Sequence, residues 1–226
     1  MINYLIINLL IIIFPLLFSF EKRIRYYKHF KSLFPAIFIV GTYYILWDIV
    51  ATARGDWWFN HDYVMDLEFA GLPLEEMLFF VTAPYSCIFI YESLQIFVKD
   101  RQLSINPRLF IIPAMISAAG GIVFLHQDYT STVLFSVALF FFMAVFLLPR
   151  MLQSLIYWLY IIIVVIPFFV MNYLLTSTPI VLYNSDAIWN IRVTTIPAED
   201  FFYNFGMLSF YLIVYLLFKE RVENNS

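Results

Sequence analysis

The chain contains seven apolar segments, each long enough to cross a lipid bilayer. The hydrocarbon core of a bilayer is about 30 Å thick, and a helix needs roughly 20 residues to span it. Because lipid cannot satisfy the unpaired groups of an open strand, we expect helices for all seven. The segments lie at residues 2–20, 33–51, 74–98, 108–125, 131–149, 154–175 and 198–218.

Composition supports an all-α, polytopic membrane protein. The 226 residues are 63% hydrophobic and only 13% charged, whereas a soluble domain carries about 25% charged residues. No basic patch interleaved with aromatics is present, so nucleic acid is not an expected partner.

Cys87 is the single cysteine, which excludes a disulfide within the chain and a cysteine-based metal site. The first segment lacks a basic start and a small-residue cleavage site, so we expect a retained helix.

The distribution of Lys and Arg predicts the orientation. Cytoplasmic loops of membrane proteins carry an excess of these residues. One side of the predicted bundle would hold only Arg54 and Arg192. The other side would hold Lys22, Arg23, Arg25, Lys28, Lys31, Lys99, Arg101, Arg108, Arg150, Lys219 and Arg221. We therefore expect a multi-pass protein of the inner (cytoplasmic) membrane, with the N-terminus outside and the C-terminus in the cytoplasm.

Two acidic motifs suggest an internal repeat. "GLPLEEMLFF" at 71–80 opens the third segment, and "TIPAEDFFYN" at 195–204 opens the seventh. Their Pro and acidic positions align at a constant offset of 124 residues. Four crossings separate the two segments, so both enter the membrane from the same side. We therefore predict a 3+1+3 parallel repeat, with a shared site between the halves. The halves would be residues 1–100 and 131–226, joined by a linking helix within 101–130.

The paired acids of these motifs are the main candidates for chemistry. Acids after a proline in a first helical turn are also what helix capping alone would produce. Capping does not require two adjacent acids, however, and acids at a membrane edge usually face the bundle interior. Two close carboxyls cannot both ionise cheaply, so one could act as an acid and its ionised neighbour as a base. The candidates are Glu75, Glu76, Glu199 and Asp200.

Other polar and aromatic residues extend this candidate site. Asp48 is an ionisable group near the outer end of the second segment. The offset of 124 residues aligns it with Asn172 of the sixth segment. The Asn172 side chain could form a hydrogen bond across helices. Arg192 could neutralise a neighbouring carboxylate. Residues one turn below the acids could stabilise a cation or simply pack in the core. They are Phe79, Phe80, Tyr203 and Asn204.

The sequence gives little support for a cofactor or a metal. Asp62 and Asp66 form a single D-x-x-x-D, a pattern that can hold magnesium on a diphosphate, but few basic residues accompany it. No G-x-G-x-x-G is present, so no dinucleotide fold is indicated. The seventh segment has no internal lysine for a retinal Schiff base. We expect neither a metal nor a cofactor.

The two motifs together resemble those of the small membrane lycopene cyclases, in the form where two related halves are fused in one chain. The resemblance spans nearly the whole chain and includes "PIVLYN" at 179–184 and the pair Trp47 and Asp48. It implies cofactor-independent, acid-catalysed cyclisation of the ends of lycopene to β-ionone rings, giving β-carotene through γ-carotene. It also implies that the four motif acids are site residues. The expected partners are the carotenoid substrate, membrane lipid and other enzymes of the carotenoid pathway.

Two other functions remain open from the residues themselves. A carotenoid end-group hydratase would share the cation but add water, and product mass would distinguish it. A proton-coupled transporter would also place paired acids in a parallel repeat. Within the cyclase interpretation, we expect Glu75 or Glu76 to be the acid and the second motif to be the base or the cation stabiliser.

Overall fold

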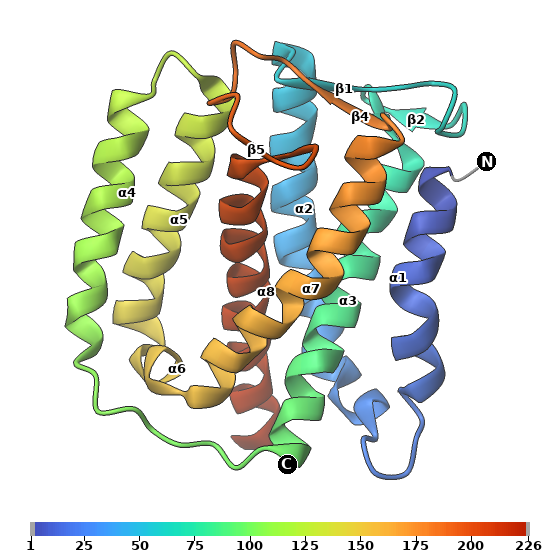
Figure 1. Cartoon of the computed structure of the whole chain (residues 1–226). Helices are drawn as coiled ribbons and strands as arrows, with labels where there is room; N and C mark the ends of the chain where they lie inside the picture. Colours follow the sequence, from blue (N-terminus) through green and yellow to red (C-terminus); the bar gives the residue numbers. More distant parts are fainter. Residues whose placement is uncertain (1–2, 225–226) are drawn as a thin grey trace.

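The computed structural model describes residues 3–224 as a bundle of α-helices with short strands at one end (Figure 1). Two 3-10 turns, Tyr26–His29 and Pro107–Phe110, lead into the second and fourth helices. The α-helices are α1 (Tyr4–Phe18), α2 (Phe30–Arg54), α3 (Leu74–Phe97), α4 (Ile111–Val123), α5 (Asp128–Leu147), α6 (Pro149–Gln153), α7 (Leu155–Ser177) and α8 (Ala198–Asn224).

The predicted apolar segments are confirmed as helices, with boundaries shifted by a few residues. Five of them, α2, α3, α5, α7 and α8, are long and apolar enough to cross a membrane. The other two, α1 and the helix over Pro107–Val123, are apolar but shorter. The protein is therefore a multi-pass helical membrane protein. The added α6 is a five-residue turn between α5 and α7.

The strands gather at one end of the bundle, where they form three small antiparallel pairs. Two of the pairs are hairpins that lead directly into α3 and α8, and Ala70 and Thr194 in their turns adopt a positive φ. The third pair joins two loops that are far apart in sequence. The pairs are β2 (Glu68–Phe69) with β3 (Leu72–Pro73), β5 (Arg192–Val193) with β6 (Ile196–Pro197), and β1 (Trp57–Phe59) with β4 (Val181–Tyr183).

Many backbone features recur 124 residues later in the chain. The Leu74 N–H donates to the Leu67 carbonyl at 2.8 Å, and the Ala198 N–H donates to the Ile191 carbonyl at 2.9 Å. Two loops far apart in the sequence also exchange equivalent bonds. The Asn60 N–H donates to the Ile180 carbonyl at 2.9 Å, and the Asn184 N–H donates to the Asp56 carbonyl at 2.8 Å. Trp58 and Leu182, which form the central pair between β1 and β4, are also 124 residues apart in the sequence.

The interior of the bundle is filled by aromatic side chains of α2, α3 and α8. Tyr44, Phe80 and Tyr211 are each at most 1% exposed, and the rings of Phe80 and Tyr211 both stack on the ring of Tyr44. The Tyr211 hydroxyl donates to the Phe80 carbonyl at 2.8 Å. A phenol in such a place needs a partner, because an unpaired buried hydroxyl is costly. These contacts fix α8 against α3 below the two acidic motifs.

A buried ionic cluster joins three helices at the end of the bundle opposite the strands. Glu92 of α3 is 4% exposed. Its carboxylate accepts hydrogen bonds from the Tyr215 hydroxyl at 2.7 Å and from the Lys219 ammonium at 2.8 and 3.0 Å, both on α8. His29, at the start of α2, lies 3.2 Å from the second carboxylate oxygen. The cluster therefore ties α2, α3 and α8 together where no strands connect them.

Replacing Glu92 with Ala should destabilise the bundle, because Lys219 and Tyr215 would lose their common acceptor. Removing one partner of a buried ion pair costs about 3 kcal/mol. The measurement is unfolding of the purified protein in detergent, with Glu220→Ala as the control because Glu220 is an exposed acid on α8, next to Lys219. Equal unfolding midpoints for the two variants would contradict a stabilising role for the cluster.

Candidate active site

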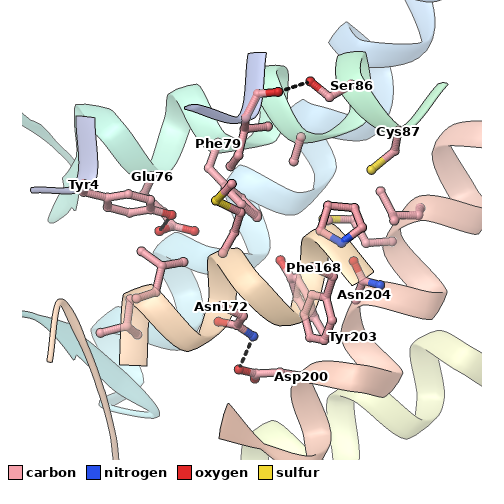
Figure 2. A pocket seen from close by; sticks show the side chains of 18 of the residues that line it. Tyr4, Glu76, Phe79, Ser86, Cys87, Phe168, Asn172, Asp200, Tyr203 and Asn204 are labelled. Atoms are coloured by element: carbon pink, nitrogen blue, oxygen red, sulfur yellow. Dashed lines mark hydrogen bonds between the residues drawn. The ribbon is translucent and has the colours of Figure 1, made fainter. Parts of the chain in front are cut away.

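A cavity of about 390 Å³ lies between α1, α3, α7 and α8, below β1 and β4 (Figure 2). Most of its lining side chains are apolar or aromatic. Three carboxyl groups, those of Asp48, Glu76 and Asp200, also line it. These acids belong to three different helices, α2, α3 and α8. Ligand sites usually combine apolar walls with a few convergent polar groups, and this cavity has that form.

Asp48 and Glu76 form a carboxyl pair at the strand end of the cavity. Both carboxyl groups line the same end of the cavity, and they are close enough to interact electrostatically. The Trp57 indole N–H donates to Asp48 Oδ1 at 2.9 Å, and the Tyr4 hydroxyl donates to Glu76 Oε2 at 2.6 Å. The second oxygen of Asp48 is buried and receives no hydrogen bond from the described protein atoms. Two neighbouring carboxyl groups in an apolar site repel each other strongly if both are charged.

Asp200 has a different environment on the facing helix. Its carboxylate accepts hydrogen bonds from the Tyr129 hydroxyl at 2.7 Å, the Tyr183 hydroxyl at 2.8 Å and the Asn172 amide at 2.9 Å. Figure 2 shows the last of these. Tyr183 lies in β4, outside the spans, where burial and the neighbouring Asp200 raise the pKa of its phenol. It is therefore a neutral donor, and three donors of this kind suit a negatively charged carboxylate.

Aromatic rings also line the cavity. Phe79 and Tyr203 both line it, and they come from the two helices that carry the acidic motifs. Figure 2 shows Tyr203, Phe168 and Asn204 together on the side of the cavity away from Tyr4 and Glu76. A ring face attracts a cation through its quadrupole. The predicted residues Phe79, Tyr203, Asn204 and Asn172 are therefore brought together with three of the predicted acids.

The first acid of each motif is buried but turned toward a loop. Glu75 Oε1 accepts a hydrogen bond from the Met65 backbone N–H at 2.7 Å. Glu199 Oε1 accepts bonds from the Trp189 backbone N–H at 2.5 Å and from the Thr130 hydroxyl at 2.7 Å. Met65 and Trp189 differ by 124 residues, as Glu75 and Glu199 do. Neither acid is among the residues that line the cavity. Each one holds the loop that precedes its own helix.

Three other predicted residues lie beside the cavity rather than in its lining. Trp47 packs against Tyr203, with ring centroids 5.1 Å apart. Phe80 is 1% exposed and belongs to the aromatic core. Arg192 is exposed, donates to the Thr195 carbonyl at 2.7 Å and lies over the Tyr183 ring at 5.8 Å. It thus contacts one donor to Asp200 and not the carboxylates themselves.

The sequence argument missed four residues that hold the acids. Tyr4, Tyr129 and Tyr183 donate to Glu76 or Asp200, and Trp57 donates to Asp48. Tyr4 and Tyr129 each lie in the first turn of a helix, at α1 and α5. The sequence feature that could have indicated Tyr4 and Tyr129 is a tyrosine at the outer end of an apolar segment. That signal is weak, because membrane proteins commonly place Tyr and Trp at both interfaces.

Within residues 3–224, no group of three or more His, Cys, Asp or Glu side chains is arranged to hold a metal ion. Asp62 and Asp66 are exposed in the loop between β1 and β2 and do not line the cavity. The acids in the cavity are instead paired with each other or with phenol, indole and amide donors. Their arrangement suits proton transfer in an apolar environment.

The fold and this cavity define a class of protein, an integral membrane protein with an internal, acid-bearing apolar site. The family model described as lycopene cyclase matches residues 2–94 and 127–218. The chain therefore belongs to the lycopene cyclase family, and the family resemblance of the motifs is confirmed. The comparison with curated proteins and the comparison with solved structures gave no match.

Replacing Glu75 with Ala should loosen the loop before α3, because the Met65 N–H would lose its acceptor. An unsatisfied buried group costs about 1–3 kcal/mol. The measurement is limited proteolysis in detergent, in which the variant should be cut faster between residues 60 and 70. Glu68→Ala is the control, since Glu68 is exposed in the same loop. Equal cleavage rates would contradict the loop-holding role.

Proposed function

We propose that this protein is a lycopene β-cyclase that converts lycopene to β-carotene through γ-carotene without a cofactor. Membership of the lycopene cyclase family supplies the substrate class. The observation that carries the mechanism is the facing arrangement of the Asp48–Glu76 pair and of Asp200 within one apolar cavity. Such a site can add a proton to a polyene and remove another while excluding water.

The Asp48–Glu76 pair is assigned the role of the acid. Two adjacent carboxyls in an apolar site are most stable when they share one proton, and that proton is then available for transfer. Glu76 delivers it to the terminal double bond of lycopene, which leaves a tertiary cation on the neighbouring carbon. This narrows the sequence expectation of Glu75 or Glu76 to Glu76, because Glu75 is turned toward Met65.

Asp200 is assigned the role of the base. One carbon of the next double bond bonds to the cationic carbon, a six-membered ring closes, and the positive charge moves to the other carbon of that double bond. Phe79 and Tyr203 stabilise the charge through their ring faces. Asp200 then removes the proton from the carbon that formed the new bond, and the double bond of the β-ring forms between this carbon and the charged one. No atom is gained or lost in the substrate, and exchange of both carboxyl sites with solvent between turnovers restores the proton of the pair and the charge of Asp200.

We further propose that the chain is the predicted parallel repeat of two halves, 1–100 and 131–226, with α4 as the link. The recurrence of loop hydrogen bonds at an offset of 124 and the equivalent bonds exchanged between the halves support it. In this arrangement the first half supplies the acid pair and the second half supplies the base. The basic residues at the end opposite the strands support the predicted orientation, with the acids near the outer face of the inner membrane.

Variants of the cavity acids should lose turnover, whereas variants of the loop acids should keep most of it. Glu76→Gln and Asp200→Asn are each expected to lower the cyclisation rate by at least about 100-fold, the usual contribution of a general acid or base. Glu75→Gln and Glu199→Gln are the matched controls. The measurement is pigment extraction from lycopene-producing cells, normalised to the amount of folded protein. Normal conversion by both cavity variants would overturn the assignment.

Solvent isotope should appear in the product at one atom per ring. When the reaction runs in D₂O, the acid pair exchanges with solvent and delivers deuterium to the CH carbon of the terminal double bond, while Asp200 removes a hydrogen from a different carbon. Mass spectrometry of the carotenoids should show β-carotene with one deuterium for each ring formed. A product heavier by one water would instead indicate a hydratase, and no pigment change together with proton flux in liposomes would indicate a transporter.

A further inference from the structure

The cavity is elongated, and its acids all lie at one end. Along α3 it is lined from Glu76 to Ile90, a span of 14 residues and about 21 Å of helix. Beyond Phe79 the lining is apolar apart from a few uncharged groups. One of these, the Ser86 hydroxyl, donates to the Ile11 carbonyl at 2.9 Å and so has its own partner (Figure 2). The cavity is thus an apolar tunnel, and the carboxyl groups of Asp48, Glu76 and Asp200 lie at one end of it.

The far part of the tunnel reaches the lipid-facing surface between α1 and α7. Leu10 and Phe14 of α1 line the cavity, yet their side chains are 49% and 58% exposed. α1 packs mainly on α3 and only lightly on α7. In Figure 1, α7 is tilted so that it approaches α1 near the strands and diverges from it toward the opposite end. Of the five long spans, α7 is the least buried in the described chain.

We propose that the linear polyene enters end-first from the bilayer through this mouth, formed by Leu10, Phe14, Ile90 and Phe168, and that one end reacts per binding event. The inference rests on the proposed function. A hydrocarbon dissolved in the membrane interior reaches the mouth without crossing water. Its leading end then meets Glu76 and Asp200, while the rest of the chain stays in the tunnel and in the lipid.

The carboxyl arrangement limits the reaction to one end at a time. The position equivalent to Asp48 in the second half is Asn172, an amide that cannot supply a proton. Glu75 and Glu199 are turned toward loops. The described chain therefore has one acid cluster for two substrate ends. A conjugated polyene is rigid and cannot fold back to bring both ends to that cluster. The one-ring product must withdraw into the lipid, reverse and enter again before the second ring closes.

An isotope-dilution experiment tests the release of the one-ring intermediate. The purified protein in liposomes receives carbon-13 lycopene together with a tenfold excess of unlabelled γ-carotene. We expect β-carotene that is almost entirely unlabelled at early times, because released labelled γ-carotene mixes with the added pool. Fully labelled β-carotene despite the excess would overturn the inference. Absence of any cyclic product from lycopene alone would instead overturn the proposed function.

A bulky residue at the mouth tests the route. Leu10→Trp should raise the KM for lycopene at least tenfold with a smaller change in kcat, because the mouth is narrowed and the acids are untouched. Leu9→Trp is the matched control, since Leu9 is 54% exposed on the same helix but does not line the cavity. Phe14→Trp is a second mouth variant if the first is unstable. Folding is checked by thermal unfolding, and mouth variants that behave as Leu9→Trp would overturn the route.

Discussion

The structure depends on one constraint, which is that carboxyl groups placed inside a hydrocarbon bundle must find partners from other elements. Asp48 receives an indole N–H from β1, Glu76 a phenol from α1, and Asp200 donors from α5, β4 and α7. Each of these hydrogen bonds joins a helix to another helix or strand, and those from Tyr4 and Tyr129 join residues 72 and 71 positions apart. Because an unpaired buried charge is expensive, the partners must stay in place for the bundle to be stable. The same bonds that stabilise the acids therefore define the shape of the cavity.

The two acids of each motif have different surroundings. The first acid, Glu75 or Glu199, accepts from a backbone N–H of the loop before its own helix. This anchors the hairpin that leads into the helix. The second acid, Glu76 or Asp200, is one position further around the helix and so faces the cavity. In an α-helix, adjacent residues point in directions about 100° apart, so two neighbouring acids serve two different surfaces. An adjacent pair lets one helix start both hold a loop and place a carboxyl group in the cavity.

Positions 124 residues apart in the chain are alike in their loops but differ in the cavity. The loops are held by equivalent bonds, yet Asn172 stands 124 residues after Asp48. The Asn172 amide donates to Asp200, whereas the Asp48 carboxyl is close enough to Glu76 to interact electrostatically. One side of the cavity is therefore suited to hold a proton and the other to hold a negative charge. We propose that this asymmetry turns a repeated scaffold into an acid facing a base.

The sequence by itself determined the helical membrane class, because apolar segments of bilayer length in a chain so poor in charge have no other stable form. It also determined the four motif acids as candidates, since two acids shortly after a proline occur twice, 124 residues apart, and this pattern is visible without coordinates. The tertiary structure alone decided which acid faces the cavity, because adjacent residues on a helix differ only in direction. It also decided that Tyr4, Tyr129, Tyr183 and Trp57 are the partners. Those contacts join segments up to 72 residues apart, and no local pattern encodes which distant ring will meet which carboxyl.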